Sequence, residues 1–146
     1  MRRRDQRVTL CPSAQPDDGA VVIGVVGGSV EEPRVRPLEH PIPVSRTVLA
    51  LAAPVLPTEV FRFAAPCQEG ACPHFARSTC TLASKVVRML PPVADDLPPC
   101  DIRAGCRWFA QEGRAACLRC PQVATNNGRF SAALRRAADP AVPVPE

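Results

Sequence analysis

Residues 67–80, CQEGACPHFARSTC, place three cysteines and a histidine within the length of one loop. These residue types bind soft metal ions, form disulfides or fill a small core. The chain around them has 146 residues, enough for one domain with short extensions. It contains 18 prolines, five phenylalanines, one tryptophan and no tyrosine. We therefore expect a thin hydrophobic core that needs support from metal ions or disulfides.

The N-terminal sequence and the hydropathy of the chain predict a cytoplasmic protein. The chain begins MRRRDQRVTL, which is basic but lacks the apolar run of a signal peptide. No segment approaches the roughly 18 apolar residues that a membrane-spanning helix needs, so we expect no membrane association. In the reducing cytosol, clusters of cysteines are more often metal sites or reactive thiols than disulfides.

Seven of the eight cysteines lie between residues 67 and 120 and, with one histidine, form two groups of four. The spacing of the first group is C-x4-C-x-H-x5-C, and that of the second is C-x5-C-x10-C-x2-C. Four soft ligands are the number that a tetrahedral zinc ion or an iron–sulfur cluster requires. The predicted ligands are Cys67, Cys72, His74 and Cys80 in the first group, and Cys100, Cys106, Cys117 and Cys120 in the second.

Local features of both groups favour thiolate ligation. Cys80 begins a predicted helix, whose positive dipole end is expected to lower its thiol pKa. Cys117 and Cys120 lie one turn apart, and the proline after Cys120 matches the C-P end of the bacterial ferredoxin run. A continuous helix from Cys106 to Cys117 would separate them by roughly 16 Å along its axis. We therefore predict that Gly113 ends a helix and the chain folds back; ligand sets crossed between the groups are the alternative.

The spacing leaves the identity of the metal open. Zinc sites typically pair two C-x2-C knuckles, and only one is present, so we favour an iron–sulfur cluster of the [4Fe–4S] type over Zn²⁺ in the second group. His74 suits zinc, and it is explained equally well as a loop residue. Cys11 is remote in sequence and is interpreted as a small buried residue or an exposed bystander. Disulfides and metal-free buried thiols are the alternatives to a metal site.

Residues 20–38, AVVIGVVGGSVEEPRVRPL, have the alternation and the β-branched residues of a β-hairpin or ribbon. Val21, Ile23 and Val25 are predicted to share one face. The glycines of this segment predict a bulge or a close backbone contact, and they do not match a phosphate-binding loop.

Short helices are predicted on either side of the first cysteine group. Ser45 caps one helix that Pro54 stops, and Thr58 caps a second short turn, EVFRFAA. The clearest helix is CTLASKVVRML, residues 80–90, whose apolar residues recur at helical spacing. The predicted core residues of these elements are Phe61, Phe63, Leu82, Val86, Met89 and Leu90.

These elements predict an α+β protein, with a short N-terminal β-hairpin or ribbon followed by a small, helical, cysteine-rich half centred on metal. Residues 1–10 form a basic flexible arm, and residues 11–125 form a single cysteine-rich domain. Within that domain, residues 20–66 hold the hairpin and short helices, and residues 67–120 hold the metal-binding region. Residues 126–146 are expected to form a short helix, SAALRRAAD, and a disordered proline-rich tail.

The chain resembles a family of small cysteine-rich bacterial proteins, some of which carry the label nitrogen fixation protein. Five runs carry the resemblance: LCPSAQP, GVVGGSVEEPRV, PTEVFRFAAPC, LPPCDIR and CRWFAQEGRAACLRCPQVAT. It covers about residues 10–125 and leaves the C-terminal tail outside. The label implies iron–sulfur or electron-transfer biochemistry, and it implies no mechanism and no catalytic residue.

Our first functional hypothesis is a small cytoplasmic metalloprotein that binds an iron–sulfur cluster through the second cysteine group. The first group would hold a second metal site. Such a protein would act on a protein partner as a redox, assembly or sensing factor. Trp108 and Phe109 would shield the centre from water, or serve as ordinary core.

Two other function classes stay open. A structural zinc module for protein or nucleic-acid interaction would use Arg2–Arg4 and Arg135–Arg136 for phosphate contacts. The net charge of +4 with dispersed arginines supports that use of the arginines only weakly. An enzyme with a reactive cysteine is the third class, but no GxSxG or HExxH motif is present, and we do not predict catalysis. The sequence sets neither the oligomeric state nor the pathway.

Overall fold

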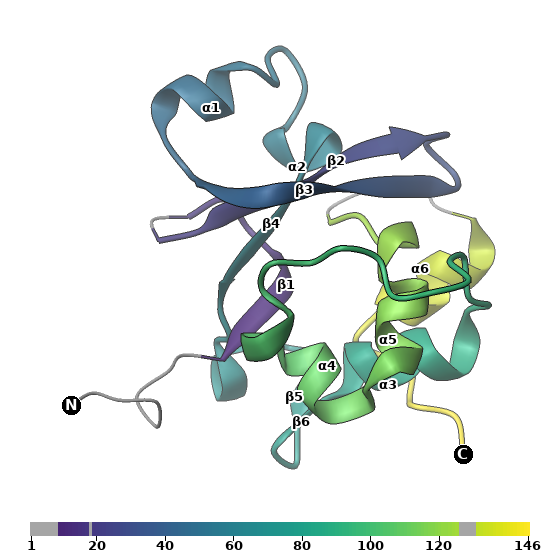
Figure 1. Cartoon of the computed structure of the whole chain (residues 1–146). Helices are drawn as coiled ribbons and strands as arrows, with labels where there is room; N and C mark the ends of the chain where they lie inside the picture. The colour runs from purple at the N-terminus through teal and green to yellow at the C-terminus, as the bar shows by residue number, and fades with distance from the viewer. Residues whose placement is uncertain (1–8, 18, 126–130) are drawn as a thin grey trace.

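A computed structural model of the chain describes residues 9–17, 19–125 and 131–146. An antiparallel four-stranded sheet crosses the molecule, in the order β1-β4-β2-β3 (Figure 1). This sheet and the helices around it confirm the α+β prediction. The strands are β1 (Leu10–Ala14), β2 (Val21–Gly28), β3 (Pro33–Pro43) and β4 (Phe61–Pro66), and a separate ribbon pairs β5 (Phe75–Ala76) with β6 (Thr79–Cys80).

Helices lie on both sides of the sheet. Figure 1 shows α3, α4, α5 and α6 grouped on one side, and α1 and α2 on the other. The α-helices are α1 (Arg46–Ala50), α2 (Pro57–Val60), α3 (Thr81–Met89), α4 (Arg107–Glu112), α5 (Arg114–Arg119) and α6 (Ala132–Ala138). Among the described residues, the short 3-10 helices are η2 (Glu69–Ala71), η3 (Arg103–Gly105) and η4 (Cys120–Gln122).

The predicted hairpin is confirmed as β2 and β3, and β3 runs on to Pro43. A proline has no N–H to donate to a strand ladder, so it is normally confined to sheet edges. The strand β3 carries prolines at positions 33, 37, 41 and 43, and it lies at the end of the strand order. Its position at the edge explains how so proline-rich a segment forms a strand.

The strict alternation predicted for β2 is wrong at Val25. Val21 and Ile23 pack against the core as expected, but Val25 is 39% exposed and Val26 packs against the core in its place. The pairing of β2 with both neighbours shifts register between Val22 and Gly24, and such a bulge reverses which side chains face inward. Gly24 is required there because a Cβ would lie 2.5 Å from the Val35 Cγ1 atom.

The segment EVFRFAA was expected to continue as a helical turn, and this prediction is wrong beyond Val60. Residues Phe61–Pro66 form β4, which lies between β1 and β2 in the sheet. Thr58 lies buried inside α2 and is not its cap. Phe63 is fully buried, as predicted, and pairs across the sheet with Val22. The strands β1 and β2 form hydrogen bonds with the backbone N–H and C=O groups of β4 on its two edges. The local sequence pattern of residues 61–66 does not predict this pairing.

The predicted N-terminal arm ends earlier than expected. Residues 1–8 lie outside the described residues, but Leu10 already begins β1. In this strand Cys11 lies opposite Ala65 of β4. Cys11 is therefore part of the folded sheet and half-buried.

The predicted helix in SAALRRAAD is confirmed as α6, and it packs into the core. Leu134 and Ala137 are buried in one cluster with residues of α3, α4 and α5. The expectation of a disordered tail is wrong as far as Val142, because buried Lys85 donates to the carbonyls of Asp139 at 2.6 Å and Val142 at 2.9 Å. Over the described residues, no helix has the length and apolar character to cross a membrane.

Candidate metal centre

The second cysteine group surrounds a single cavity. The helix α4 ends at Gly113, with φ 70° and ψ −150°, and α5 returns along it, so the predicted fold-back is confirmed. This backbone region is almost restricted to glycine. The four predicted ligands Cys100, Cys106, Cys117 and Cys120 all line the same cavity of about 70 Å³.

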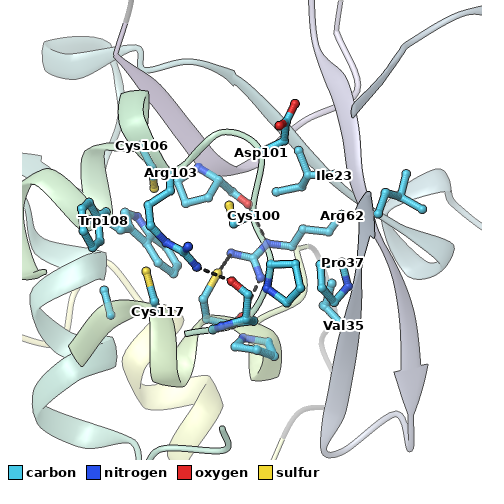
Figure 2. Close-up of a pocket in the computed structure, with 18 of the residues that line it drawn as sticks. Ile23, Val35, Pro37, Arg62, Cys100, Asp101, Arg103, Cys106, Trp108 and Cys117 are labelled. Atoms are coloured by element: carbon cyan, nitrogen blue, oxygen red, sulfur yellow. Dashed lines mark hydrogen bonds between the residues drawn. The ribbon is translucent and has the colours of Figure 1, made fainter. Parts of the chain in front are cut away.

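The far wall of the cavity comes from the sheet (Figure 2). Ile23 of β2 and Val35 and Pro37 of β3 face the cysteines across the space. Trp108 and Phe109 of α4 also line it, and both belong to or pack against the hydrophobic core. Cys106 is buried, whereas Cys100 is exposed, so the cavity reaches the surface beside Cys100.

A buried arginine that the sequence analysis missed joins the cysteines to the sheet. Arg62 of β4 is only 2% exposed, and its Nη2 donates to the Cys120 Sγ at 3.1 Å. Its Nη1 donates to the carbonyls of Cys120 at 2.6 Å and Val123 at 2.9 Å, and its Nε to Pro12 at 2.6 Å. The guanidinium also lies 5.4 Å from the ring centroid of Trp108. It is therefore held rigidly with one donor aimed at a sulfur.

No carboxylate neutralises Arg62 in the described part of the chain. The ion pairs there join Arg107 to Glu69 at 2.8 Å and Arg114 to Asp96 at 3.2 Å. Asp101 lines the cavity, but it is exposed and Figure 2 shows its carboxylate turned away from Arg62. The guanidinium is paired instead with three backbone carbonyls and the Cys120 sulfur, so added negative charge at that sulfur would be stabilised.

Two further donors at the cavity lack partners. The Trp108 Nε1 and Arg103 Nε atoms are buried without a hydrogen-bond partner, and both residues line the cavity. Arg103 is otherwise anchored by its Nη2, which donates to the Pro98 carbonyl. Unpaired buried donors are rare in native proteins and call for an acceptor. Thiolates and the sulfides of an iron–sulfur cluster are acceptors of this kind.

Two of the four cavity thiols, those of Cys106 and Cys100, have raised pKa values. Burial raises the pKa of Cys106 to about 11, and Cys120 and Cys100 add to this increase. Burial also raises the pKa of Cys100, with further contributions from Cys120 and Cys117. These mutual effects show that the four thiols are electrostatic neighbours. A metal would bind here by displacing their protons.

The first cysteine group contacts α4 through Gln111, whose side chain hydrogen-bonds to the backbone of Cys80. Cys80 caps α3, and its Sγ accepts from the Ala83 N–H at 3.4 Å. The predicted decrease in its pKa is wrong: burial raises the pKa of Cys80 more than its hydrogen bonds to the backbone of Ala83 and Leu82 lower it. The thiols of Cys72 and Cys67 raise it further.

Cys11 and His74 occupy places that their spacing did not reveal. Burial raises the pKa of Cys11 to about 11, and the thiols of Cys80 and Cys67 add to the increase, so Cys11 belongs beside the first group. His74 has a pKa lowered by burial and by Lys85, with Asp139 opposing, and its Nδ1 is buried without a partner. The charged neighbours of the imidazole are thus Lys85 and Asp139.

All eight cysteines lie in the described part of the chain, and all are free thiols. Within that part, no three His, Cys, Asp or Glu side chains form a group that could hold a metal ion as they stand. The thiols of the second group line the cavity and do not converge on a single metal-binding point. Thiols are residue types that metal–sulfur centres use.

Sequence reasoning missed Arg62 and Cys11 for different reasons. The alternation of Phe61, Arg62 and Phe63 was a signal for a strand, which would have turned the arginine away from the phenylalanines. Cys11 gave no local signal, because only strand pairing brings it to the first group.

Comparison of the chain with protein-family models, with curated proteins and with solved structures found no match.

Proposed function

We propose that this chain is a cytoplasmic metalloprotein that binds one iron–sulfur cluster in the cavity lined by Cys100, Cys106, Cys117 and Cys120. It would serve as a redox, assembly or sensing factor for a protein partner. One observation carries the proposal. Four thiols line one cavity, and buried Arg62, which pairs with no carboxylate among the described residues, donates a hydrogen bond to the sulfur of one of them.

The charges of the site and of the cofactor are complementary. Four thiolates around a [4Fe–4S]²⁺ core carry about two negative charges. Arg62 and Arg103 line the cavity and supply two positive charges. The cluster would thus neutralise the buried guanidinium, and its sulfur atoms would accept the N–H groups that lack partners. Hydrogen bonds to the sulfurs are a known means of setting the reduction potential.

The shape of the site favours a cluster over a single zinc ion. A tetrahedral Zn²⁺ with bonds of about 2.3 Å needs its four sulfurs about 3.8 Å from each other. Here the thiols line a cavity of about 70 Å³. The proline after Cys120 supports the same choice, as does the resemblance of the sequence to cysteine-rich bacterial proteins, some labelled nitrogen fixation protein, a label that implies iron–sulfur biochemistry.

The surroundings of the cluster support electron exchange at one edge. Trp108 is 2% exposed and, with the sheet residues of the far wall, would keep water from the centre. Cys100 is the exposed member of the group. A partner protein would therefore approach at Cys100, the thiol that reaches the surface.

The test is anaerobic purification of the full chain with an absorption spectrum and measurement of iron, sulfide and zinc on the same sample. We expect a brown protein with equal iron and sulfide. Cys117→Ser should remove this cluster, because it removes a thiolate from the cavity wall. Leu51→Ala is the control, because this side chain is 71% exposed and outside the cavity, and it should keep the spectrum and the metal content.

A colourless protein with stoichiometric zinc lost in Cys117→Ser would contradict the cluster and favour a structural zinc module. Metal-free protein with all thiols intact after reconstitution with iron and sulfide would overturn both readings of the cavity.

A further inference from the structure

Strand pairing places Cys11 and Cys67 on one face of the sheet. Cys11 lies opposite Ala65, and the Cys67 N–H donates to the Thr9 carbonyl at 2.8 Å, which continues the same ladder. Cys11 and Cys67 are thus diagonal neighbours across an antiparallel pair. Such neighbours share a face, with separations of about 7–8 Å or less between their Cβ atoms.

The β5–β6 ribbon brings Cys72 and Cys80 together. The Phe75 N–H donates to the Cys72 carbonyl at 3.0 Å, and Phe75 pairs with Cys80 across the ribbon. The Gln111 side chain of α4 fixes Cys80 by accepting from its N–H at 2.8 Å and donating to its carbonyl at 2.9 Å. The ribbon is therefore held against the C-terminal end of α4.

The same helix α4 also holds β1. Leu10 forms a β-bridge with Cys106, the residue that caps α4. Both cysteine pairs are therefore attached to α4, the first through its N-cap residue and the second through Gln111 near its C-terminal end. Their thiols interact: Cys80 and Cys67 both act on Cys11, and Cys72 and Cys67 both act on Cys80.

We propose that Cys11, Cys67, Cys72 and Cys80 form a second metal site with four thiolate ligands, in which Cys11 takes the place that the spacing assigned to His74. All four are half-buried, so the site is partly shielded and open to a metal. The proposal rests on the proposed function only for the class of group expected, a thiophilic metal centre.

The buried ammonium group of Lys85 could balance negative charge at this site. Lys85 of α3 is fully buried, and its Nζ donates to two backbone carbonyls, those of Asp139 and Val142. Its pKa is lowered by burial, while Asp139 and the thiol of Cys80 oppose this. A metal with four thiolates carries about two negative charges and would favour the charged form of Lys85. Buried Arg62 also lowers the pKa of Cys11, although burial raises it more, so two buried cations lie near this site.

Metal binding would require small movements of the thiols. Rotation about one Cα–Cβ bond between staggered positions moves a sulfur by about 3 Å. Each thiol that binds loses its proton to solvent. The resulting thiolate then donates a lone pair of electrons on its sulfur to the metal, which forms the metal–sulfur bond. The backbone contacts described above need not change.

The first test uses the unaltered chain, purified without oxygen and loaded with zinc or with iron and sulfide. Each cysteine is alkylated before and after chelation, and its modification is quantified by mass spectrometry. We expect Cys11, Cys67, Cys72 and Cys80 to be protected in the loaded protein and to become reactive together on chelation. Unprotected Cys11 beside protected Cys67, Cys72 and Cys80 would overturn the proposal.

The second test compares metal content in Cys11→Ser and His74→Ala, with circular dichroism to confirm folding. We expect Cys11→Ser to lower the content from two centres to one and His74→Ala to leave it unchanged. Loss in His74→Ala with retention in Cys11→Ser would show the original ligand set to be right. A wild-type protein with one centre, lost completely in Cys117→Ser, would overturn this proposal and leave the proposed function intact. A wild-type protein with one centre that is lost in Cys11→Ser and kept in Cys117→Ser would support this proposal and contradict the proposed function.

Discussion

Arg62 is the residue at which the sheet and the cavity meet. It is buried in a central strand, where a charged side chain is rarely placed without a partner. Its four hydrogen bonds end on three backbone carbonyls and one cysteine sulfur, so three contacts define its position and the fourth acts on the thiol. The hydrogen bond to the sulfur would be strongest if that sulfur were a metal-bound thiolate, because donor and acceptor would then carry opposite charges.

The substitution Arg62→Gln should therefore weaken metal retention by about 10–100-fold, the usual cost of losing a hydrogen bond around a metal ligand. Competition with a chelator measures this loss. Arg36→Gln removes the same charge from an exposed position on β3 and should change retention little. Equal effects of the two variants would mean that Arg62 acts only through net charge.

At the scale of the elements, the reversal between α4 and α5 decides the site. The two helices have six residues each, too short to be stable alone, and Gly113 turns the chain so that Cys117 returns to Cys106. No heavy atom lies within 4 Å of the place where a Cβ of residue 113 would stand, so its backbone angles alone demand glycine.

Gly113→Ala should lower the free energy of unfolding by about 1–3 kcal/mol, the cost of an unfavourable backbone conformation. Denaturant unfolding of the metal-free protein measures this. Gly70→Ala is the matched control, because Gly70 also has open space around it but no positive φ. A loss of similar size at Gly70 would show that the backbone angles of Gly113 are not the cause.

At the scale of the whole molecule, one core unites segments from both ends of the chain. Ala64 of β4, Trp108 of α4 and Leu134 of α6 belong to a single buried cluster. The C-terminal segment covers α3 and provides the carbonyls that hold Lys85. The thin core expected from the composition is thus enlarged by a helix that lies outside the region of sequence resemblance.

Leu134→Ala should lower the free energy of unfolding by about 2–5 kcal/mol, because it opens a cavity in this shared core. Leu51→Ala makes the same change at a side chain that is 71% exposed and should cost less than about 0.5 kcal/mol. Thermal or denaturant unfolding distinguishes the two. A small loss at Leu134 would mean that α6 contributes little to stability.

Prediction from sequence succeeded where the signal was local. The hairpin, the cap at Ser45, the helix after Cys80 and the reversal at Gly113 each depend on residues close together in the chain. It failed at β1 and β4, because their pairing is with distant strands and a short run gives no period of its own. It also failed for the pKa of Cys80, since the burial of a thiol depends on packing that a spacing does not describe.

The sequence by itself determined the inventory of this protein: eight cysteines in a proline-rich chain, with spacings and turn residues that bring the second group into one cavity. Only the tertiary structure decided what surrounds that cavity. Strand pairing placed Arg62 against Cys120 and moved Cys11 beside Cys67. The physical reason is that capping and turns act between near neighbours, whereas the burial of a charge and the pairing of strands are set by segments far apart in the chain.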